Sequence, residues 1–521
     1  MSASFFNKLW LSQQSKFADE FHLNAGQIKS FQASKLRHYL EENSNTEFGK
    51  KHDFSSIRNY EDYKQAVPIL EDYSDYKSYI DQIAAGKSNI LFPGKPLFFE
   101  TTSGTSKEVK LIAYNKELKK EFAKAVATWM HDLNRLNPKI FSGKSYWSLS
   151  PALKNRDISS GGIRIGTSND SDYFDPLSAL FLNQIFAVPN QISRITDPHE
   201  FYLHTWSHLL TSKKLTFISV WSPQFLIRLV DFFKENLREI CNKSGATRAW
   251  TDYIMGHMND GTFTLSLIFP DLQMISCWTQ GQSKIWLKKL LSLSGVLPIQ
   301  GKGLLSTEGV VSIPIGMDKQ VLSYTSHFYE FKGSDTSIYT AVDLIPDNIY
   351  EVIITTGGGL YRYNTHDLVR CTGFYNAIPC LEFLGRSGQN SDLVGEKISE
   401  TSLLDLFNTV LDHYTQTEAL YLYAVKSEIT AGYLLIIESD YSENEEKIKA
   451  MVESGLKQNP YYAQAIQSGQ LQDLQSKSVA AGFSKILTAY YQKIKKIKDG
   501  DLKLPVLFPL NFLDELLNVK P

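Results

Sequence analysis

The sequence predicts an α/β protein of two domains, with a large N-terminal domain over residues 1–386 and a small α+β domain over residues 387–521. Its 521 residues are too many for a single compact core. Helical and strand patterns alternate along most of the chain, which is typical of α/β architecture. The polar stretch 385–391 (GRSGQNS) follows an apolar, strand-like run and has the composition of a flexible linker.

The first elements are predicted by their periodicity. Residues 116–130 predict a helix because their apolar side chains share one helical face. The run 215–220 (LTFISV) predicts a buried strand, and 224–233 (QFLIRLVDFF) predicts the helix that follows it. The residues of the face on 116–130 are Leu118, Phe122, Ala125, Trp129 and Met130.

The later elements follow the same alternation. Residues 348–356 predict a strand that ends at three consecutive glycines, 357–359. In the smaller domain, 419–425 and 433–438 predict two strands. The helix after them is expected to start at 442–445 (SENE), which has the form of a capping box.

Composition excludes several functional classes. Hydrophobic residues make up 43% and charged residues 21% of the chain, and 54 basic side chains balance 56 acidic ones to a net charge of −2. This balance lacks the basic footprint of a nucleic-acid-binding protein. No apolar run approaches a membrane span, and the N-terminus lacks a signal-peptide core. The four scattered cysteines fit reduced thiols in a cytoplasmic protein, and they leave a catalytic cysteine open.

Residues 97–110 (LFFETTSGTSKEVK) hold the strongest chemical signal. The run Ser103-Gly104-Thr105-Ser106 offers hydroxyl and backbone N–H groups on a bendable loop, which suits a polyanion such as triphosphate. Lys110 adds a mobile cation. The second glycine of a P-loop is missing, so a P-loop phosphotransferase is not predicted. A solvated turn is the alternative interpretation, and the start of the helix at 116 is expected near the bound group.

Two further clusters carry polar chemistry. In 303–309 (GLLSTEG), Glu308, between Thr307 and Gly309, suits Mg²⁺, a hard cation that prefers oxygen ligands, although a simple turn with a solvent-facing glutamate is the alternative. In 359–367 (GLYRYNTHD), Asp367 suits the two hydroxyls of a ribose. The structural alternative there is an ion pair between Arg362 and Asp367. Arg386 follows the next strand and suits phosphate or ribose.

In this order the clusters resemble the acyl-adenylate-forming enzymes, and among them the auxin-responsive Gretchen Hagen 3 family of acyl acid amido synthetases, in a bacterial-type form. The resemblance covers most of the chain and is loose over 130–300 and in the tail. It implies a β-barrel and sheets flanked by helices in the large domain, with the small domain on a hinge. The stretches that carry it are 46–49 (TEFG), 63–69 (YKQAVPI), 101–106 (TTSGTS), 306–308 (STE), 359–367 (GLYRYNTHD), 373–376 (GFYN) and 391–397 (SDLVGEK).

The resemblance also implies roles for single residues. Thr307 would contact phosphate, Glu308 would hold the metal, and Leu304 and Leu305 would lie near adenine. Tyr363 matches the tyrosine of the third motif. The phosphate-contacting residues would be Ser103, Gly104, Thr105, Ser106 and Lys110, with Asp367 on the ribose and Lys397 and Lys503 as the phosphate-approaching lysines of the small domain.

One position departs from the family pattern. The third motif ordinarily has glycine directly before its aspartate, whereas His366 stands there. His366 adjoins the expected ribose site, so a catalytic base and a structural histidine are both open interpretations.

The implied activity is a two-step ligation that uses ATP and Mg²⁺. A carboxylic acid is adenylated with loss of pyrophosphate, and an amino acid amine then displaces AMP. Two rivals stay open, a coenzyme A ligase that transfers the acyl group to a thiol, and a nucleotide-binding protein without catalysis.

The acid is expected to bind in the middle of the chain, which is rich in aromatic residues. The family builds part of its acyl pocket from the strand–helix unit 215–233, which makes Trp221, Ser222 and Phe225 the candidates. An aromatic acid would suit such a pocket. The alternative is that most of these rings belong to the core. The aromatic residues concerned are Trp206, Trp221, Phe225, Trp250, Trp278 and Trp286.

Overall fold

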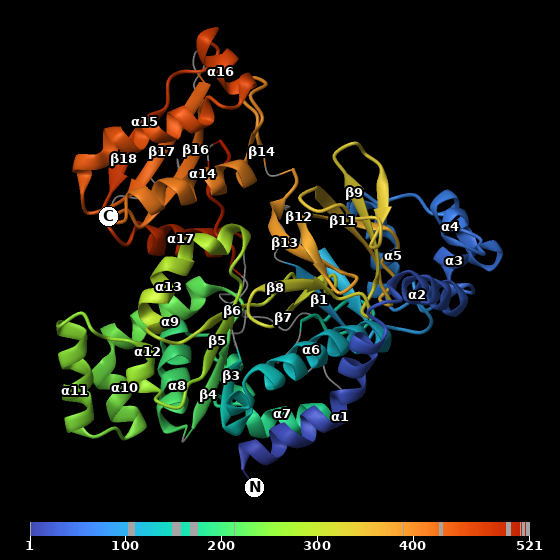
Figure 1. The fold of residues 1–521 in the computed structure, drawn as a ribbon, viewed down its shortest axis with the longest axis horizontal. Coiled ribbons are helices and arrows are strands. Elements are labelled where there is room, and N and C mark those ends of the chain that lie inside the picture. Colours follow the sequence, from blue (N-terminus) through green and yellow to red (C-terminus); the bar gives the residue numbers. More distant parts are fainter. Residues whose placement is uncertain are drawn as a thin grey trace. The chain divides into compact units, whose positions relative to one another are not determined.

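The computed structural model describes residues 2–102, 110–147, 158–166, 176–212, 214–388, 390–426, 431–495, 502–510, 512 and 516. The chain forms two compact units (Figure 1). The first contains Met1–Thr279 and Leu287–Phe383, and the second contains Gln280–Trp286, Leu384–Ile497 and Leu502–Pro521. The chain passes from the first unit to the second within strand β13 (Ile378–Arg386).

A four-stranded parallel sheet lies in the first unit, in the order β3-β4-β5-β6. Helices α8, α9 and α13 lie beside it (Figure 1). Strand β4 and helix α9 confirm the predictions for 215–220 and 224–233. The elements are β3 (Lys144–Trp147), β4 (Leu215–Ser219), β5 (Met274–Cys277), β6 (Ile299–Gly301), α8 (Pro198–Thr211), α9 (Pro223–Glu235), α10 (Leu237–Ser244), α11 (Arg248–Asn259), α12 (Leu265–Ile268) and α13 (Leu287–Ser294).

A seven-stranded sheet, β10-β9-β11-β12-β13-β8-β7, and a separate hairpin, β1–β2, complete the sheets of this unit. Strand β11 confirms the prediction for 348–356. The strands are β1 (Phe98–Thr102), β2 (Lys110–Tyr114), β7 (Ser312–Ile315), β8 (Lys319–Leu322), β9 (Phe328–Gly333), β10 (Ile338–Thr340), β11 (Ile349–Thr355) and β12 (Tyr363–Tyr375).

Helix α6 (Lys116–Leu136) packs against α1 (Ala3–Leu23), which also contacts α7 (Pro176–Ile185) (Figure 1). All five apolar side chains of the predicted face of α6 are buried, because the helix lies inside the unit. The other N-terminal helices are α2 (Ile28–Asn43), α3 (Glu47–Lys51), α4 (Tyr60–Ala66) and α5 (Ser74–Ala84).

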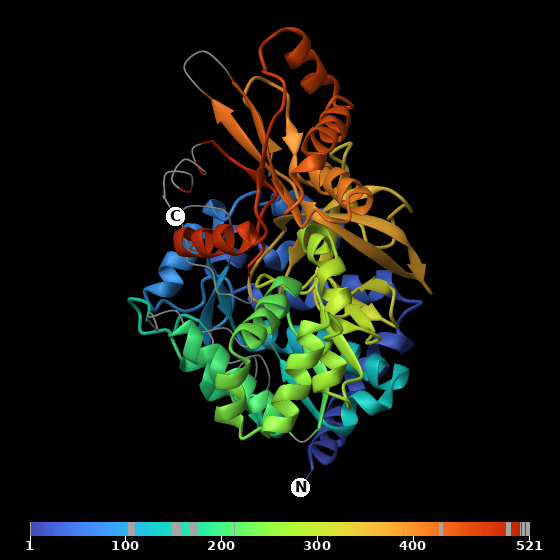
Figure 2. The same ribbon diagram turned by 90° about the vertical axis from the view of Figure 1, so that its left-hand side faces the viewer.

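The second unit is built on the sheet β18-β17-β16-β19. One core joins this sheet to α14, α15 and α16, and another joins its opposite face to α17 (Figure 2). The expected capping box is wrong, because α15 begins at Glu445 after Asn444, which makes no side-chain cap bond. The elements are β14 (Asn390–Ser391), β15 (Ile398–Ser399), α14 (Glu400–His413), β16 (Ala419–Lys426), β17 (Ala431–Glu438), α15 (Glu445–Leu456), α16 (Pro460–Gln467), β18 (Gln475–Val479), α17 (Phe483–Lys495) and β19 (Leu507–Phe508).

None of the helices in the described ranges combines the length and the apolar character that crossing a bilayer requires.

Candidate active site

Both strands that flank the expected phosphate loop are described, while Ser103, Gly104, Thr105 and Ser106 themselves lie outside the described residues. The hairpin pairs Thr102 with Lys110, so Lys110 stands at the loop end of β2. Its Nζ atom lies 5.6 Å from the ring centroid of Tyr73. Lys110 is thus held on an aromatic face beside the loop.

The start of α6 follows the expected phosphate loop along the chain, after strand β2. The five residues of β2 separate the loop from the helix, and an extended strand of that length spans roughly 16 Å. Asn115 caps the helix by accepting the N–H of Leu118 at 2.9 Å. Its side-chain amide donates to the carbonyl oxygen of Gly357 at 2.7 Å. The helix start is therefore tied to the glycine turn after β11.

Thr307 and Glu308 form a tight turn closed by the N–H of Ser306, which donates to the Gly309 carbonyl at 2.9 Å. The Tyr114 hydroxyl donates to the Thr307 carbonyl at 2.8 Å and fixes the turn to the end of β2. The Glu308 side chain does not face solvent, because only 5% of the residue is exposed. The alternative of a solvent-facing glutamate is therefore wrong.

A second carboxylate, that of Glu100 in β1, faces the same tyrosine. Burial, together with the charges of Glu100 and Glu308, raises the pKa of Tyr114 well above its ordinary value. Buried carboxylate oxygens are the type of ligand that Mg²⁺ prefers. Glu100 was not among the site residues expected from the sequence, although it is the one acidic residue in the stretch 97–102 (LFFETT).

Asp367 is 3% exposed and lies in a bulge of β12. The pairing with β11 shifts between Glu351 and Ile353, so that Thr365, His366 and Asp367 share one irregular stretch. The Thr365 hydroxyl donates to the Val352 carbonyl at 2.9 Å and accepts the Asp367 N–H at 3.2 Å. The bulge therefore fixes the backbone position of Asp367 in the sheet.

Arg362 pairs with Glu330, so the ion pair expected as the structural alternative for Arg362 and Asp367 is wrong. The guanidinium donates to both carboxylate oxygens of Glu330 at 2.9–3.1 Å. It also donates to the backbone carbonyl oxygen of Val67 at 2.8 Å.

His366 has a left-handed backbone, with a φ of 59°. Its Nε2 atom lies 2.6 Å from the Glu71 carbonyl oxygen. A carbonyl only accepts, so Nε2 carries the proton and is already committed to this bond. The geometry therefore favours a structural histidine.

His366 also lies close to the carboxylates of Glu71 and Glu351. The Asn364 amide donates to both of these carboxylates, at 2.6 and 2.9 Å. Lys332 pairs with Glu71 at 2.8 Å. The negative charge of the Glu71 and Glu351 carboxylates is therefore already partly offset by the Asn364 amide and the Lys332 ammonium.

The aromatic candidates separate into core and edge residues. Phe225 is fully buried in α9, and Ser222, at the start of that helix, is also buried. Trp206 is a core residue whose ring N–H donates to the Leu229 carbonyl. Trp221 instead is half-buried and lies just past the carboxyl end of β4. Trp278 lies just past the end of β5, and the centroids of the two rings are 5.6 Å apart.

Lys302 follows β6 at the same edge of the parallel sheet and was missed from the sequence. It is 2% exposed, and its Nζ lies 4.1 Å from the ring centroid of Trp221 and 5.7 Å from that of Trp129. Carboxyl ends of neighbouring parallel strands meet at one edge, where ligands of α/β proteins bind. Trp221, Trp278 and Lys302 thus form an aromatic, cationic group at this edge.

The four cysteines are buried and free. Burial raises the pKa of Cys277 to about 12, although the charge of Lys302 opposes the shift. Burial also raises the pKa of Cys241, Cys371 and Cys380. All four are therefore thiols near neutral pH, which argues against a cysteine nucleophile.

The second unit carries Arg386, Lys397 and Lys503. Lys397 is exposed and has a left-handed backbone, with a φ of 49°. The buried carboxylate of Glu396 accepts the backbone N–H groups of Leu393 and Val394, both at 2.8 Å. The loop that presents Lys397 is therefore anchored from inside its own unit.

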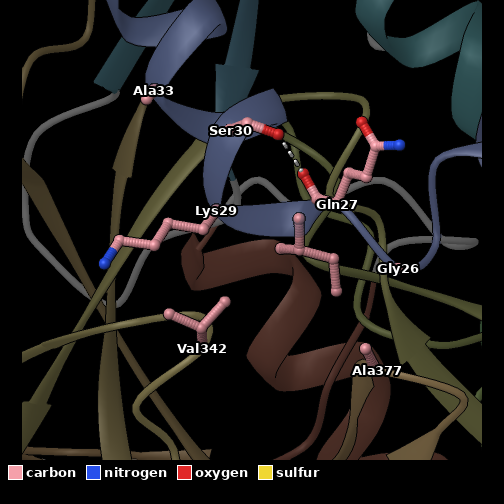
Figure 3. Close-up of a pocket in the computed structure, with 8 residues that line it drawn as sticks. Gly26, Gln27, Lys29, Ser30, Ala33, Val342 and Ala377 are labelled. Carbon is pink, nitrogen blue, oxygen red and sulfur yellow. Dashed lines mark hydrogen bonds between the residues drawn. The ribbon is translucent and has the colours of Figure 1, made fainter.

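A hollow of about 430 Å³ lies at the start of α2 and contains none of the predicted site residues (Figure 3). Lys29 is its one charged lining residue among the eight that line it, and the Ser30 hydroxyl bonds to the Gln27 carbonyl within its wall (Figure 3). This hollow has no group of converging polar side chains of the kind expected at an active site.

Comparison with protein families identifies the chain. Residues 17–249 match the GH3 family N-terminal domain, and residues 320–386 match the GH3 family central domain. The chain belongs to the GH3 family of acyl acid amido synthetases. The resemblance seen in the sequence is thereby confirmed.

The relatives within this family are distant in sequence, but their alignments cover most of both chains. The chain is 25% identical over 437 residues to an indole-3-acetic acid-amido synthetase of Arabidopsis thaliana, covering 74% of this chain and 71% of the relative. It is 24% identical to a jasmonoyl–L-amino acid synthetase of Nicotiana attenuata, covering 75% and 74%. A 4-substituted benzoates-glutamate ligase of Arabidopsis thaliana is 23% identical, covering 82% and 81%.

Solved structures share the fold. The GH3.15 acyl acid amido synthetase in complex with 2,4-DB aligns with a TM-score of 0.82 and 19% identity, covering 98% of this chain and 95% of that one. A 2-hydroxyisobutyryl-CoA ligase aligns with a TM-score of 0.53 and 12% identity, covering 95% and 92%. The predicted adenylate-forming α/β fold is confirmed.

Proposed function

We propose that the chain adenylates a small carboxylic acid with ATP and transfers the acyl group to the amine of an amino acid. One carboxylate oxygen attacks the α-phosphorus of ATP and pyrophosphate leaves. The amine nitrogen then attacks the acyl carbon, its proton passes to solvent, and AMP leaves. Family membership supports this assignment together with one geometric observation, the Tyr114 hydroxyl that ties the Thr307–Glu308 turn to the hairpin bearing Lys110.

Each end of the nucleotide has a group suited to it. Thr307 and Lys110 are proposed for the phosphates, with Ser103 to Ser106 completing the loop. Asp367 is proposed for the ribose, with Tyr363 two residues before the bulge that directs it. Positively polarised donors around the α-phosphate would offset the charge that develops as the bond to pyrophosphate breaks.

Glu308 and Glu100 would hold Mg²⁺, because both are buried carboxylates that face Tyr114. When bound, the ion supplies charge neutralisation on the triphosphate. The Tyr114 hydroxyl holds the Thr307 turn, and the two carboxylates would keep the cation site next to the phosphate loop.

Trp221 and Lys302 are proposed to receive the acid, with Ser222 and Phe225 behind them. The ammonium of Lys302 would hold the carboxylate in its ionised, nucleophilic form, and the neighbouring tryptophan rings would contact a flat acyl group. An aromatic carboxylic acid is the substrate class that this arrangement favours.

In the C-terminal unit, Lys397, Lys503 and Arg386 are proposed as phosphate-approaching groups whose contacts exchange between the two steps through a hinge rotation. Such an enzyme is proposed to act in the cytoplasm, because its four cysteines are free. It would act on small molecules, without a nucleic-acid partner.

The decisive experiment is acid-dependent ATP–pyrophosphate exchange across a panel of aromatic and aliphatic carboxylates. Amino acids or coenzyme A are then added to the reactions that exchange. Amide formation supports the proposal, and thioester formation would favour the coenzyme A ligase. ATP binding without exchange on any acid would favour a nucleotide-binding protein without catalysis.

A further inference from the structure

The carboxylate of Glu121, in the second turn of α6, lies at the centre of a buried polar network. It is 0% exposed and accepts the hydroxyl of Tyr39. The backbone N–H of Gly357 donates to it at 3.0 Å, and the Lys35 ammonium lies 3.4 Å away. The Nδ1 atom of His327 lies 3.0 Å from its Oε2 atom. A buried carboxylate with four partners is a fixed point in the fold.

The ring of His327 extends this network to the Thr307–Glu308 turn. The backbone N–H of Val310 donates to Nε2 of His327 at 3.0 Å. A backbone N–H only donates, so Nε2 accepts and Nδ1 carries the proton that is given to Glu121. His327 is 0% exposed. The ring thus joins Val310 to Glu121 with one bond at each nitrogen.

One end of this chain of bonds lies at the turn proposed for the phosphates, and the other lies at the glycine turn between β11 and β12, the strand that carries Asp367. Val310 follows Glu308 by two residues, and Gly357 opens the turn that leads to Asp367. Neither end has room for a side chain at its glycine. A side chain at Gly309 would place its Cβ 2.7 Å from Nε2 of His327, and one at Gly357 would place it 2.9 Å from Oε1 of Glu121.

We propose that Glu121 and His327 are positioning residues that hold the Thr307–Glu308 turn and the Gly357–Gly359 turn at a fixed separation, so that the phosphate and ribose ends of ATP are bound together. Neither side chain contacts substrate in this proposal. The inference rests on the proposed ATP site. His327 bonds to Val310 through one ring nitrogen and, through the other, to Glu121, which accepts the Gly357 N–H.

Two substitutions break one bond each. His327→Asn places an amide donor near the Nδ1 position and keeps the bond to Glu121, while it loses the acceptor for Val310. His327→Gln places its amide near the Nε2 position, so that it keeps an acceptor for Val310 and loses the bond to Glu121. The matched control is Asn7→Ala, which removes buried bonds from the Asn7 amide to the carbonyls of Phe141 and Gly143 and contacts neither turn.

The measurement is the KM for ATP and kcat in pyrophosphate exchange, at a temperature where urea denaturation shows every variant fully folded. We expect both His327 variants to raise the KM for ATP roughly tenfold, since each leaves a buried group unpaired and frees one turn. Asn7→Ala lowers the unfolding midpoint with KM unchanged. His327 variants that lose stability and keep the KM of the wild type would overturn the proposal.

Calorimetric titration with ATP itself, whose ribose hydroxyls are unmodified, separates this inference from the proposed function. If no acid supports exchange, the titration still shows whether the turns hold a nucleotide. Gly309→Ala is the third variant, because it leaves both His327 bonds chemically possible and only pushes the turn away from the ring. Weaker binding in Gly309→Ala supports the inference, and unchanged binding in all three variants contradicts it.

Discussion

The Nη2 atom of Arg362 lies 2.9 Å from Oε1 of Glu330, and both side chains are buried. Arg362 has a left-handed backbone with a φ of 49°, and it also donates to the carbonyls of Lys64 and Val67. The pair therefore joins the end of α4 to β9 and to the start of β12. Its effect is to set the backbone of the strand that carries Asp367.

Arg362→Met should lower the free energy of unfolding of the protein by about 3–5 kcal/mol, because it leaves the buried Glu330 carboxylate without the positive charge that balances it. Urea denaturation followed by tryptophan fluorescence measures this loss. The double variant Arg362→Met with Glu330→Gln should recover part of it, since no bare charge is left. A single variant as stable as the wild type would show that the pair does not hold the strand.

Glu121 makes stability depend on pH. Burial alone would raise its pKa, but the Lys35 ammonium, His327 and the bond from Tyr39 outweigh burial and lower the pKa to about 2. A carboxyl whose folded pKa lies below its ordinary value of 4.5 stabilises the fold above pH 4.5, and this contribution is lost as pH falls towards 2.

Glu121→Gln should therefore destabilise the protein most at neutral pH, with a difference from wild type that shrinks as pH falls below 4.5. Urea denaturation at steps from pH 7 downward, over the range where both proteins stay folded, gives the curve. Glu41→Gln, at an exposed carboxylate of α2, serves as the control and should follow the wild type. A difference that stays constant with pH would mean that the ionised carboxylate is not what stabilises the fold.

The elements and the contiguous motifs could be predicted because their signals are local. The apolar face of α6 repeats every three or four residues, and the Thr307–Glu308 turn lies in seven consecutive residues. The partners that hold these motifs carry no local pattern. Glu121 and His327 are 206 residues apart, and Lys302 meets Trp221 only because β4 and β6 belong to one parallel sheet. Such pairings arise from topology.

Lys302→Met should raise the KM for the carboxylic acid roughly tenfold to a hundredfold and leave the KM for ATP unchanged, since a charge-assisted bond to the carboxylate is lost. Exchange assays at saturating ATP with varied acid measure this effect. Trp278→Phe tests the aromatic wall and should alter the preference between flat and branched acids more than the rate. Equal KM values for the acid in wild type and Lys302→Met would remove Lys302 from the acid site.

Asp367→Ala should raise the KM for ATP about a hundredfold and abolish adenylation at ordinary ATP concentrations, because two hydrogen bonds to the ribose hydroxyls are lost. The bulge itself should survive, since Thr365 holds it through the Val352 carbonyl. A 2′-deoxy analogue of ATP offers a second readout, because the wild type should discriminate against it and the variant should not. Glu382→Gln, on the neighbouring strand at a half-exposed pair with Arg370, is the control and should keep wild-type kinetics. If Asp367→Ala stayed active with unaltered ATP affinity, the aspartate would have no part in binding the ribose, and the bulge would serve the sheet alone.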